Sequence, residues 1–91
     1  MTILSSDNTN LVARVRKIGG QVAAIERAFD AGTGCTEVLH LVAAVRGAVS
    51  GLLDEIIAEH LISHVAQPGL TNEQRAEGAR ELLAVIRRYA K

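Results

Sequence analysis

The chain has almost no aromatic residues and very little proline or cysteine. Its 91 residues include one Phe, one Tyr, no Trp, one Pro and one Cys. A single cysteine excludes a disulfide framework within the chain, and it excludes zinc ribbons and knuckles, which need several cysteines. With so few aromatics, any core must be built from Ala, Val, Leu and Ile. At this length we expect one domain over residues 1–91.

The sequence also lacks a net charge and a long apolar run. Ten Lys and Arg residues balance ten Asp and Glu residues, so DNA binding would need a local basic patch. Residues 1–10 lack the basic start and apolar run of a signal peptide. Apolar stretches are interrupted by charges well before the roughly 20 residues that a membrane span needs. We therefore expect a cytoplasmic protein with no membrane partner, in which the lone cysteine stays reduced.

Two breaks divide the chain into three segments with helical spacing. The breaks are the Ala-Gly-Thr-Gly segment at 31–34 and the Pro-Gly pair at 68–69. Apolar residues recur at steps of three and four in each segment, which predicts helices over about 8–30, 35–66 and 72–90. No segment shows the alternation of a strand. The predicted fold class is therefore all-α, with a three-helix protomer.

Local signals mark the helix starts and one apolar stripe. Asp7 or Asn8 can cap the first helix. Thr71 and Gln74 have the spacing of a capping box at the start of the third. The stripe predicted for the first helix consists of Leu11, Val15, Ile18, Val22, Ile25 and Phe29.

The second helix is too long for a compact protomer. Its thirty-odd residues span roughly 45 Å, whereas a domain of this size has a radius of gyration near about 12 Å. Its apolar residues continue almost to the far end, so a monomer would expose them. We expect self-association, with the long helices paired in an antiparallel bundle. A close helix–helix approach would explain Gly47 and Gly51, because each costs about 1 kcal/mol of helix propensity relative to Ala.

Three residues of this helix are candidate metal ligands. His60 and His64 are four residues apart, so both imidazoles lie on one helix face and can reach one ion. Cys35 begins the helix, where the macrodipole favours the thiolate. The 25 residues between Cys35 and His60 span about 37 Å of helix. A shared site must therefore bridge two antiparallel copies. His40 is off this spacing and is interpreted as a surface or interface histidine.

Basic residues gather in the first helix. Arg14, Arg16 and Lys17 fall within four residues, and no acid lies between Asn8 and Glu26. An oligomer multiplies this cluster into a basic stripe that suits a phosphate backbone. Arg46 lies among small and apolar residues of the second helix, where its guanidinium needs a partner or faces the same basic surface. The opposing hypothesis is a metal-buffering or structural helical protein without DNA activity. No grouping of residues indicates an enzyme.

Several motifs together resemble a known family. They are RVRKIGGQV at 14–22, Cys35, VAAVRGA at 42–48 and His60. In this order and spacing they are similar to the CsoR/RcnR/FrmR family, small bacterial transcriptional repressors that sense copper, nickel or cobalt, or formaldehyde. The resemblance covers essentially the whole chain. It implies a homotetramer built as a dimer of dimers, which holds operator DNA and releases it when the inducer binds.

The resemblance also implies roles for individual residues. Cys35, His60 and His64 match the family's sensor positions. Arg14 and Lys17 match positions that it uses for DNA, with Arg16 and Arg46 as neighbours. The copper sensors have a Cys-His-Cys set, which suits soft Cu(I), whereas this chain has His64 in place of the second Cys. One thiolate and two imidazoles suit Ni, Co or Zn better. The inducing cofactor predicted here is therefore one of those three metal ions.

The N-terminus departs from both remaining branches of the family. The nickel and cobalt branch uses a histidine near the N-terminus, where this chain has Ile3. The formaldehyde branch has a proline there, where this chain has Thr2, and usually an acid in place of His64. Removal of Met1 would free the Thr2 amine. That amine can be a fourth metal ligand, or it can condense with formaldehyde and bridge to Cys35, so a formaldehyde-responsive repressor remains the alternative.

Overall fold

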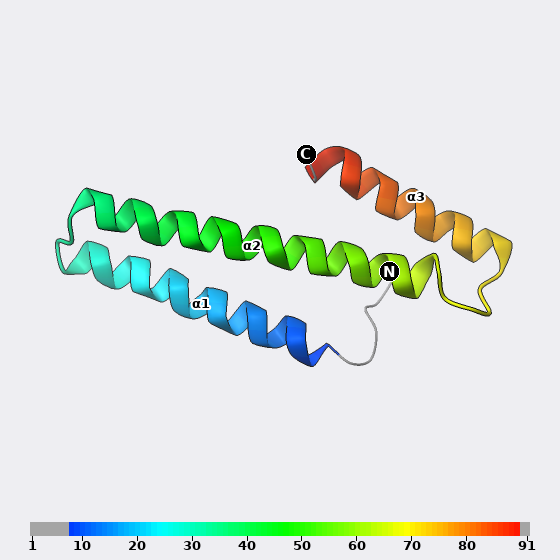
Figure 1. Ribbon diagram of the computed structural model, residues 1–91, viewed down its shortest axis with the longest axis horizontal. Helices are drawn as coiled ribbons and strands as arrows, with labels where there is room; N and C mark the ends of the chain where they lie inside the picture. Colours follow the sequence, from blue (N-terminus) through cyan, green and yellow to red (C-terminus); the bar gives the residue numbers. More distant parts are fainter. Residues whose placement is uncertain (1–7, 90–91) are drawn as a thin grey trace. The chain divides into compact units, whose positions relative to one another are not determined.

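The computed structural model describes residues 8–89, and within them the chain forms three α-helices and no strand (Figure 1). The helices are α1 (Thr9–Asp30), α2 (Cys35–His64) and α3 (Asn72–Tyr89). The all-α, three-helix prediction is confirmed. α2 ends two residues earlier than predicted, because the Ala66 N–H bonds back to the Leu61 carbonyl at 2.8 Å and closes the helix.

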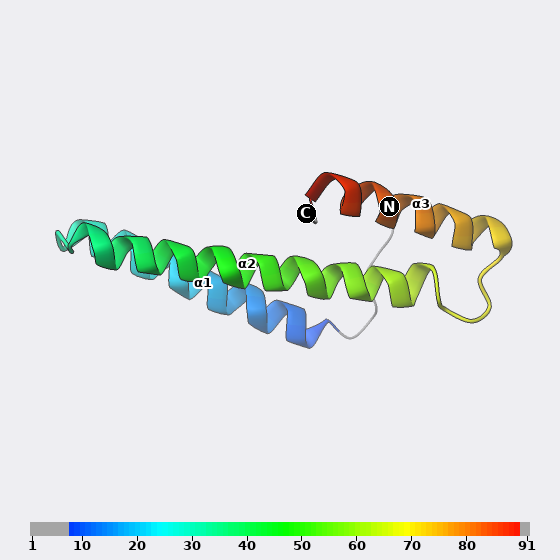
Figure 2. The ribbon, with the colours of Figure 1, turned by 45° about the horizontal axis from the view of Figure 1, so that its top comes forward.

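The described residues fall into two compact units, 8–54 and 55–89. The first contains α1 and the N-terminal part of α2, which run antiparallel and side by side (Figures 1 and 2). Their connection turns at Gly32, whose φ of 68° lies in the left-handed region that glycine adopts without strain. The Thr33 N–H closes this turn on the Ala28 carbonyl at 2.9 Å.

Only half of the stripe predicted for α1 packs within this unit. Ile18 and Ile25 are half-buried, whereas Val15, Val22 and Phe29 are 54%, 50% and 68% exposed. The packed and the exposed residues each repeat every seven positions, so they occupy neighbouring faces of one helix. The spacing predicted the helix correctly, but the chain itself covers only one of the two apolar faces.

The two predicted caps have different outcomes. Thr71 Oγ1 accepts the Gln74 N–H at 3.0 Å, and Gln74 Oε1 accepts the Thr71 N–H at 2.9 Å, so the capping box of α3 is confirmed. Asn8 occupies the N-cap position of α1 but makes no side-chain capping bond. Its backbone carbonyl instead accepts the Val12 N–H at 3.0 Å. Asp7, the other candidate, lies outside the described residues.

The second unit is the C-terminal part of α2 with α3 folded back along it (Figure 2). The connection turns at Pro68 and Gly69, and the φ of Gly69 is 90°. The buried side of α3 includes Gly78, which is the most enclosed residue of this helix. Between residues 8 and 89, no helix combines the length and apolar character needed to cross a membrane.

Candidate functional site

The two histidines at the end of α2 face one another. The ring centroids of His60 and His64 are 4.8 Å apart, and the ring planes are inclined by 55°. The His60 side chain is only 19% exposed. Residues four apart on a helix can chelate one ion from the same side, and this pair has that arrangement. The structure therefore brings together the two histidines that the sequence predicted as ligands.

A contact with α3 sets the tautomer of the neutral His60 ring. Nε2 of His60 lies 3.0 Å from the Gly78 carbonyl oxygen and 4.0 Å from Oε2 of Glu81. A carbonyl only accepts, so Nε2 must carry the hydrogen of this bond. In the neutral ring, Nδ1 is then the unprotonated nitrogen, the form that ligates a metal. An outer hydrogen bond of this kind is what orients a metal-binding histidine.

Acidic residues of α3 line the same cavity as His64. They share with it a cavity of about 620 Å³, and three glutamates in its lining are spaced four apart, Glu73, Glu77 and Glu81. Glu77 forms an ion pair with Arg80 at 2.5 Å. The remaining negative charge favours a cation near the histidine pair. From the sequence alone, these acids indicate only a charged face of a helix. Their position beside His64 depends on how α3 packs against the C-terminal part of α2.

Cys35 is exposed with a free thiol, and it begins α2 as predicted. It belongs to the first unit, and the histidine pair belongs to the second. Across residues 8–89, no three His, Cys, Asp or Glu side chains come together to hold a metal ion. Thr2, predicted as a fourth ligand or as part of a formaldehyde site, lies outside the described residues. The complete ligand set stays a prediction that requires a second chain.

The predicted DNA-binding residues are all exposed in the first unit. Arg14, Arg16 and Lys17 lie on α1, and Arg46 lies on α2. The Arg14 guanidinium reaches across to α2, where Nη1 stands 3.4 Å from the position that a Cβ on Gly51 would take. This is an ordinary van der Waals distance, so the group that approaches Gly51 within this unit is the Arg14 side chain and not the backbone of another helix.

Gln21 is a functional candidate that the sequence reasoning missed. It shares a cavity of about 410 Å³ with Arg14 and Lys17, with Ile18 and Ala48 in the lining. Its Oε1 atom is buried, and no group among the described residues bonds to it. Two cations beside an amide form a surface that suits a phosphate group. The sequence offered one signal for this role. Gln21 is a polar residue three positions after Ile18, and it therefore lies on the packed face of α1.

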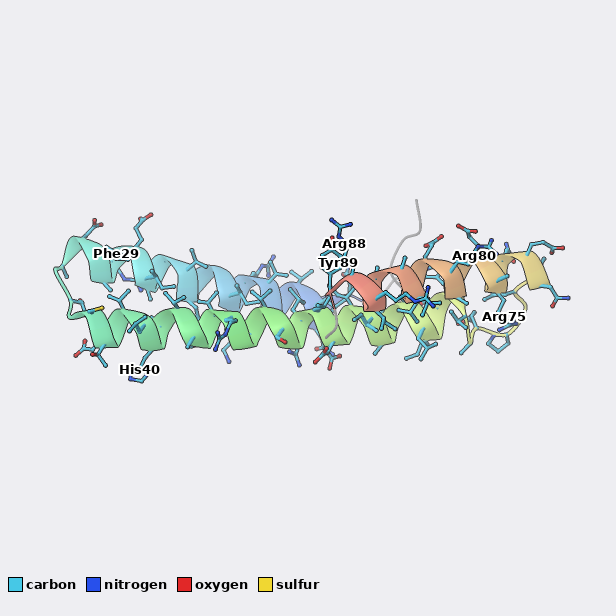
Figure 3. All side chains as sticks on the ribbon, turned by 90° about the horizontal axis from the view of Figure 1, so that it is seen from above. Phe29, His40, Arg75, Arg80, Arg88 and Tyr89 are labelled. Atoms are coloured by element: carbon cyan, nitrogen blue, oxygen red, sulfur yellow. The ribbon has the colours of Figure 1, made fainter. Side chains whose placement is uncertain are left out.

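Two further residues of α2 are open to the surroundings. His40 is exposed and projects from α2 on the side away from α1 (Figure 3), so it does not join the pair at the other end of the helix. Gly47 is also exposed, and a Cβ added there would meet nothing within 4 Å. Among the described residues nothing approaches Gly47 closely, so a close helix–helix approach there stays a prediction for paired copies.

The described residues form a small all-α fold with two candidate sites, a histidine pair and a basic face. Residues 7–88 match the model of the metal-sensitive transcriptional repressor family. The chain belongs to this family. Its members are transcriptional repressors and not enzymes, and binding to operator DNA follows from membership.

Curated relatives and a solved structure agree with this assignment. The chain is 40% identical to the transcriptional repressor RcnR of Salmonella arizonae, and 44% identical to a protein encoded in the bioA 5′ region of Serratia marcescens. Each match covers 93% of both chains. A structure of a glutamate-to-histidine variant of the formaldehyde-responsive regulator FrmR from Salmonella enterica serovar Typhimurium is 41% identical. It superposes with a TM-score of 0.85 over 91% of this chain and 93% of that one.

Proposed function

We propose that this repressor senses a divalent transition metal, Ni(II), Co(II) or Zn(II), and that the bound metal releases it from operator DNA. The observation that carries the proposal is the facing pair of imidazoles at the end of α2, with 4.8 Å between ring centroids. One of these rings is already oriented by an outer hydrogen bond to the Gly78 carbonyl. Two such nitrogens with one thiolate form a donor set that suits these metals.

The proposed site is completed by a second copy. Cys35 of one protomer would join His60 and His64 of the partner subunit, because no third ligand gathers around the pair within the described residues. The Thr2 amine is the proposed fourth ligand. The exposed apolar faces of α1 and α2 support the self-association that this arrangement needs. We place this site in a homotetramer built from two antiparallel dimers.

The proposed DNA surface is the basic face of the first unit. Arg14, Arg16 and Lys17 are exposed there, and Arg46 adds a further charge from α2. The chain carries no net charge, so this local cluster must supply the attraction to phosphate. Metal binding between two copies would change the relative orientation of their basic faces. This change would couple binding of the inducer to the affinity for DNA.

A second candidate is a repressor that responds to formaldehyde. It is favoured by the close fold match to a regulator that carries this description. The Thr2 amine would condense with formaldehyde, and the Cys35 thiol would add to the product. The result is an N–CH₂–S bridge with the loss of one water. This chemistry uses Cys35 but has no use for the facing histidines, so we prefer the metal.

The deciding experiment is a fluorescence anisotropy titration on DNA from upstream of the gene. Reduced protein is bound without oxygen and then challenged separately with Ni(II), Co(II), Zn(II), Cu(I) and formaldehyde. We expect release by one of the first three metals. Cys35→Ala and His64→Ala should keep DNA binding and lose the response. The matched control is His40→Ala, which removes an exposed histidine of the same helix outside the pair and should respond normally.

Each other result assigns a different function. Release by formaldehyde alone contradicts the metal proposal and makes Cys35 with the N-terminal amine the detector. Release by Cu(I) alone contradicts the choice of metal class. A Cys35→Ala protein that responds fully removes the thiol from the sensor. Failure to bind any promoter DNA, with metal binding intact, would favour a metal buffer.

A further inference from the structure

We infer that Arg75 and Gly78, on one face of α3, are positioning residues that hold the last turn of α2 so that His60 and His64 face a single metal ion. This inference rests on the proposed metal site. The two residues are three positions apart, so they share one side of the helix. Both contact the segment of α2 that carries the histidines or the residues directly after it.

Arg75 forms hydrogen bonds to the backbone directly after the end of α2. Its Nη1 donates to the Val65 carbonyl, and its Nη2 donates to the Gln67 carbonyl at 3.5 Å. Both carbonyls lie just after the C-terminal end of α2, where a cation also meets the negative end of the macrodipole. Val65 directly follows His64. Arg75 therefore restrains the backbone next to a proposed ligand, and it lies beside the connection between α2 and α3 (Figure 3).

Gly78 brings α3 close to both histidines. A Cβ built at this position would overlap the backbone carbonyl of His64 and would stand 3.0 Å from the His64 Cβ atom. The missing side chain lets the backbone of α3 approach until the Gly78 carbonyl accepts the His60 Nε2 hydrogen at 3.0 Å. A larger residue would push α3 away and lengthen this bond. Gly78 thus packs against one proposed ligand and orients the other.

The two contacts predict a defect in metal binding that spares DNA binding. Without Arg75 the residues directly after α2 lose this restraint, and the bound metal must order the backbone next to His64. Outer partners that bond a metal ligand directly typically account for about 10–100-fold in metal affinity, and Arg75, which acts through the backbone, should lie at the low end of this range. The proposed DNA surface lies in the other unit, among residues 8–54, so the metal-free protein should hold DNA as before.

The test measures Co(II) affinity of the full-length protein by competition with a chromophoric chelator, together with the Co(II) absorption spectrum. We expect Arg75→Ala to weaken Co(II) by about tenfold, and Arg75→Lys to recover only part of it, because an ammonium cannot reproduce the fork of a guanidinium. The matched control is Arg87→Ala. Arg87 is an exposed arginine in the last turn of the same helix and does not line the cavity beside His64, so its loss should leave Co(II) affinity unchanged.

A second readout follows the ring of His60 directly. In the metal-free protein, NMR of the histidine nitrogens should show hydrogen on Nε2 of His60. Gly78→Ala should move this signal toward a mixture of the two tautomers and weaken Co(II), while Ala79→Gly, a change at the neighbouring exposed position, should do neither. A merely structural role for Gly78 would lower stability without moving the tautomer signal.

The outcomes separate this inference from the proposed function. If His64→Ala leaves Co(II) affinity unchanged, the proposed metal site itself is wrong. If His64→Ala weakens Co(II) but Arg75→Ala does not, only the positioning role is wrong. If Arg75→Ala weakens metal-free DNA binding to the same extent as Co(II) binding, Arg75 is a general determinant of folding, and the positioning role is again wrong.

Discussion

The Arg14 side chain reaches a residue far along the chain. Its guanidinium lies over α2 at Gly51, where an added Cβ would stand in van der Waals contact with Nη1 at 3.4 Å. Gln21 and Lys17 share its cavity, and the buried amide oxygen of Gln21 has no partner within the described part of the chain. A polar atom buried in this way costs roughly 1–3 kcal/mol unless a ligand satisfies it. A DNA phosphate has no hydrogen to donate to this oxygen, so any attraction of the cavity for phosphate comes from Arg14 and Lys17.

The basic residues predict a specific dependence on salt. Arg14→Ala and Lys17→Ala should each lower operator affinity and flatten the slope of log K against log[salt] by about one for every phosphate contact removed. Anisotropy titrations at several salt concentrations measure both quantities. Arg80→Ala provides the control, because it removes an exposed arginine from the other unit. Unchanged affinity and slope in both variants would reject this surface as the DNA interface.

At the level of elements, local signals were sufficient to predict the helices. The steps of three and four identified α1, α2 and α3, and the Thr71–Gln74 box was correctly placed because both of its bonds lie within one turn. The pairing of His60 with His64 was predictable for the same reason, since both sit on one helix. Periodicity and capping depend on residues that are close in the sequence, so both can be recognised without knowledge of the tertiary structure.

What the sequence did not predict depends on docking between elements. The bonds from Arg75 to the carbonyls of Val65 and Gln67 exist only because the chain turns at Gly69. The exposed position of Val22 beside the packed Ile25 follows from the rotation of α1 against α2, and periodicity does not specify that rotation. The cap expected at Asn8 is missing for a similar reason, since its residue type permits a capping bond without imposing one.

The capping box of α3 predicts a measurable loss of stability. Thr71→Ala removes the hydroxyl that accepts the Gln74 N–H, and it should lower the free energy of unfolding by about 1 kcal/mol. Urea denaturation followed by circular dichroism measures this difference. Thr71→Ser keeps the hydroxyl and should retain the wild-type value. Equal midpoints for the Ala and Ser variants would show that the box does not stabilise the helix.

For the molecule as a whole, the main feature is how little apolar surface one chain covers. Ala28 is the only buried apolar residue among the described positions, and it is 8% exposed. Large apolar side chains on all three helices remain exposed, including Val22, Leu39, Val49 and Leu83. Surface of this kind on several helices is typical of an interface between protein chains. It agrees with the proposed pairing of copies.

Gly47 provides a test of that pairing. In an isolated helix, Gly47→Ala would raise stability by about 1 kcal/mol, because nothing within the chain opposes the added methyl group. In paired α2 helices the methyl group would meet the second copy. If the protein is the tetramer proposed above, sedimentation should shift from four chains toward smaller species. Gly20→Ala, at an equally open glycine of α1, should raise stability and keep the four-chain mass. An unchanged mass for Gly47→Ala would place the interface elsewhere.

The nearly missing core has a consequence for the amount of protein that a cell must hold. A chain that buries its apolar surface mainly against copies of itself gains its folding free energy from assembly, so its melting temperature should rise with concentration. Dilution would then separate and unfold the subunits in one step. A repressor of this kind would have a threshold concentration, below which the promoter it controls is not repressed whether or not inducer is present. Newly made chains would repress the gene only after that concentration is exceeded.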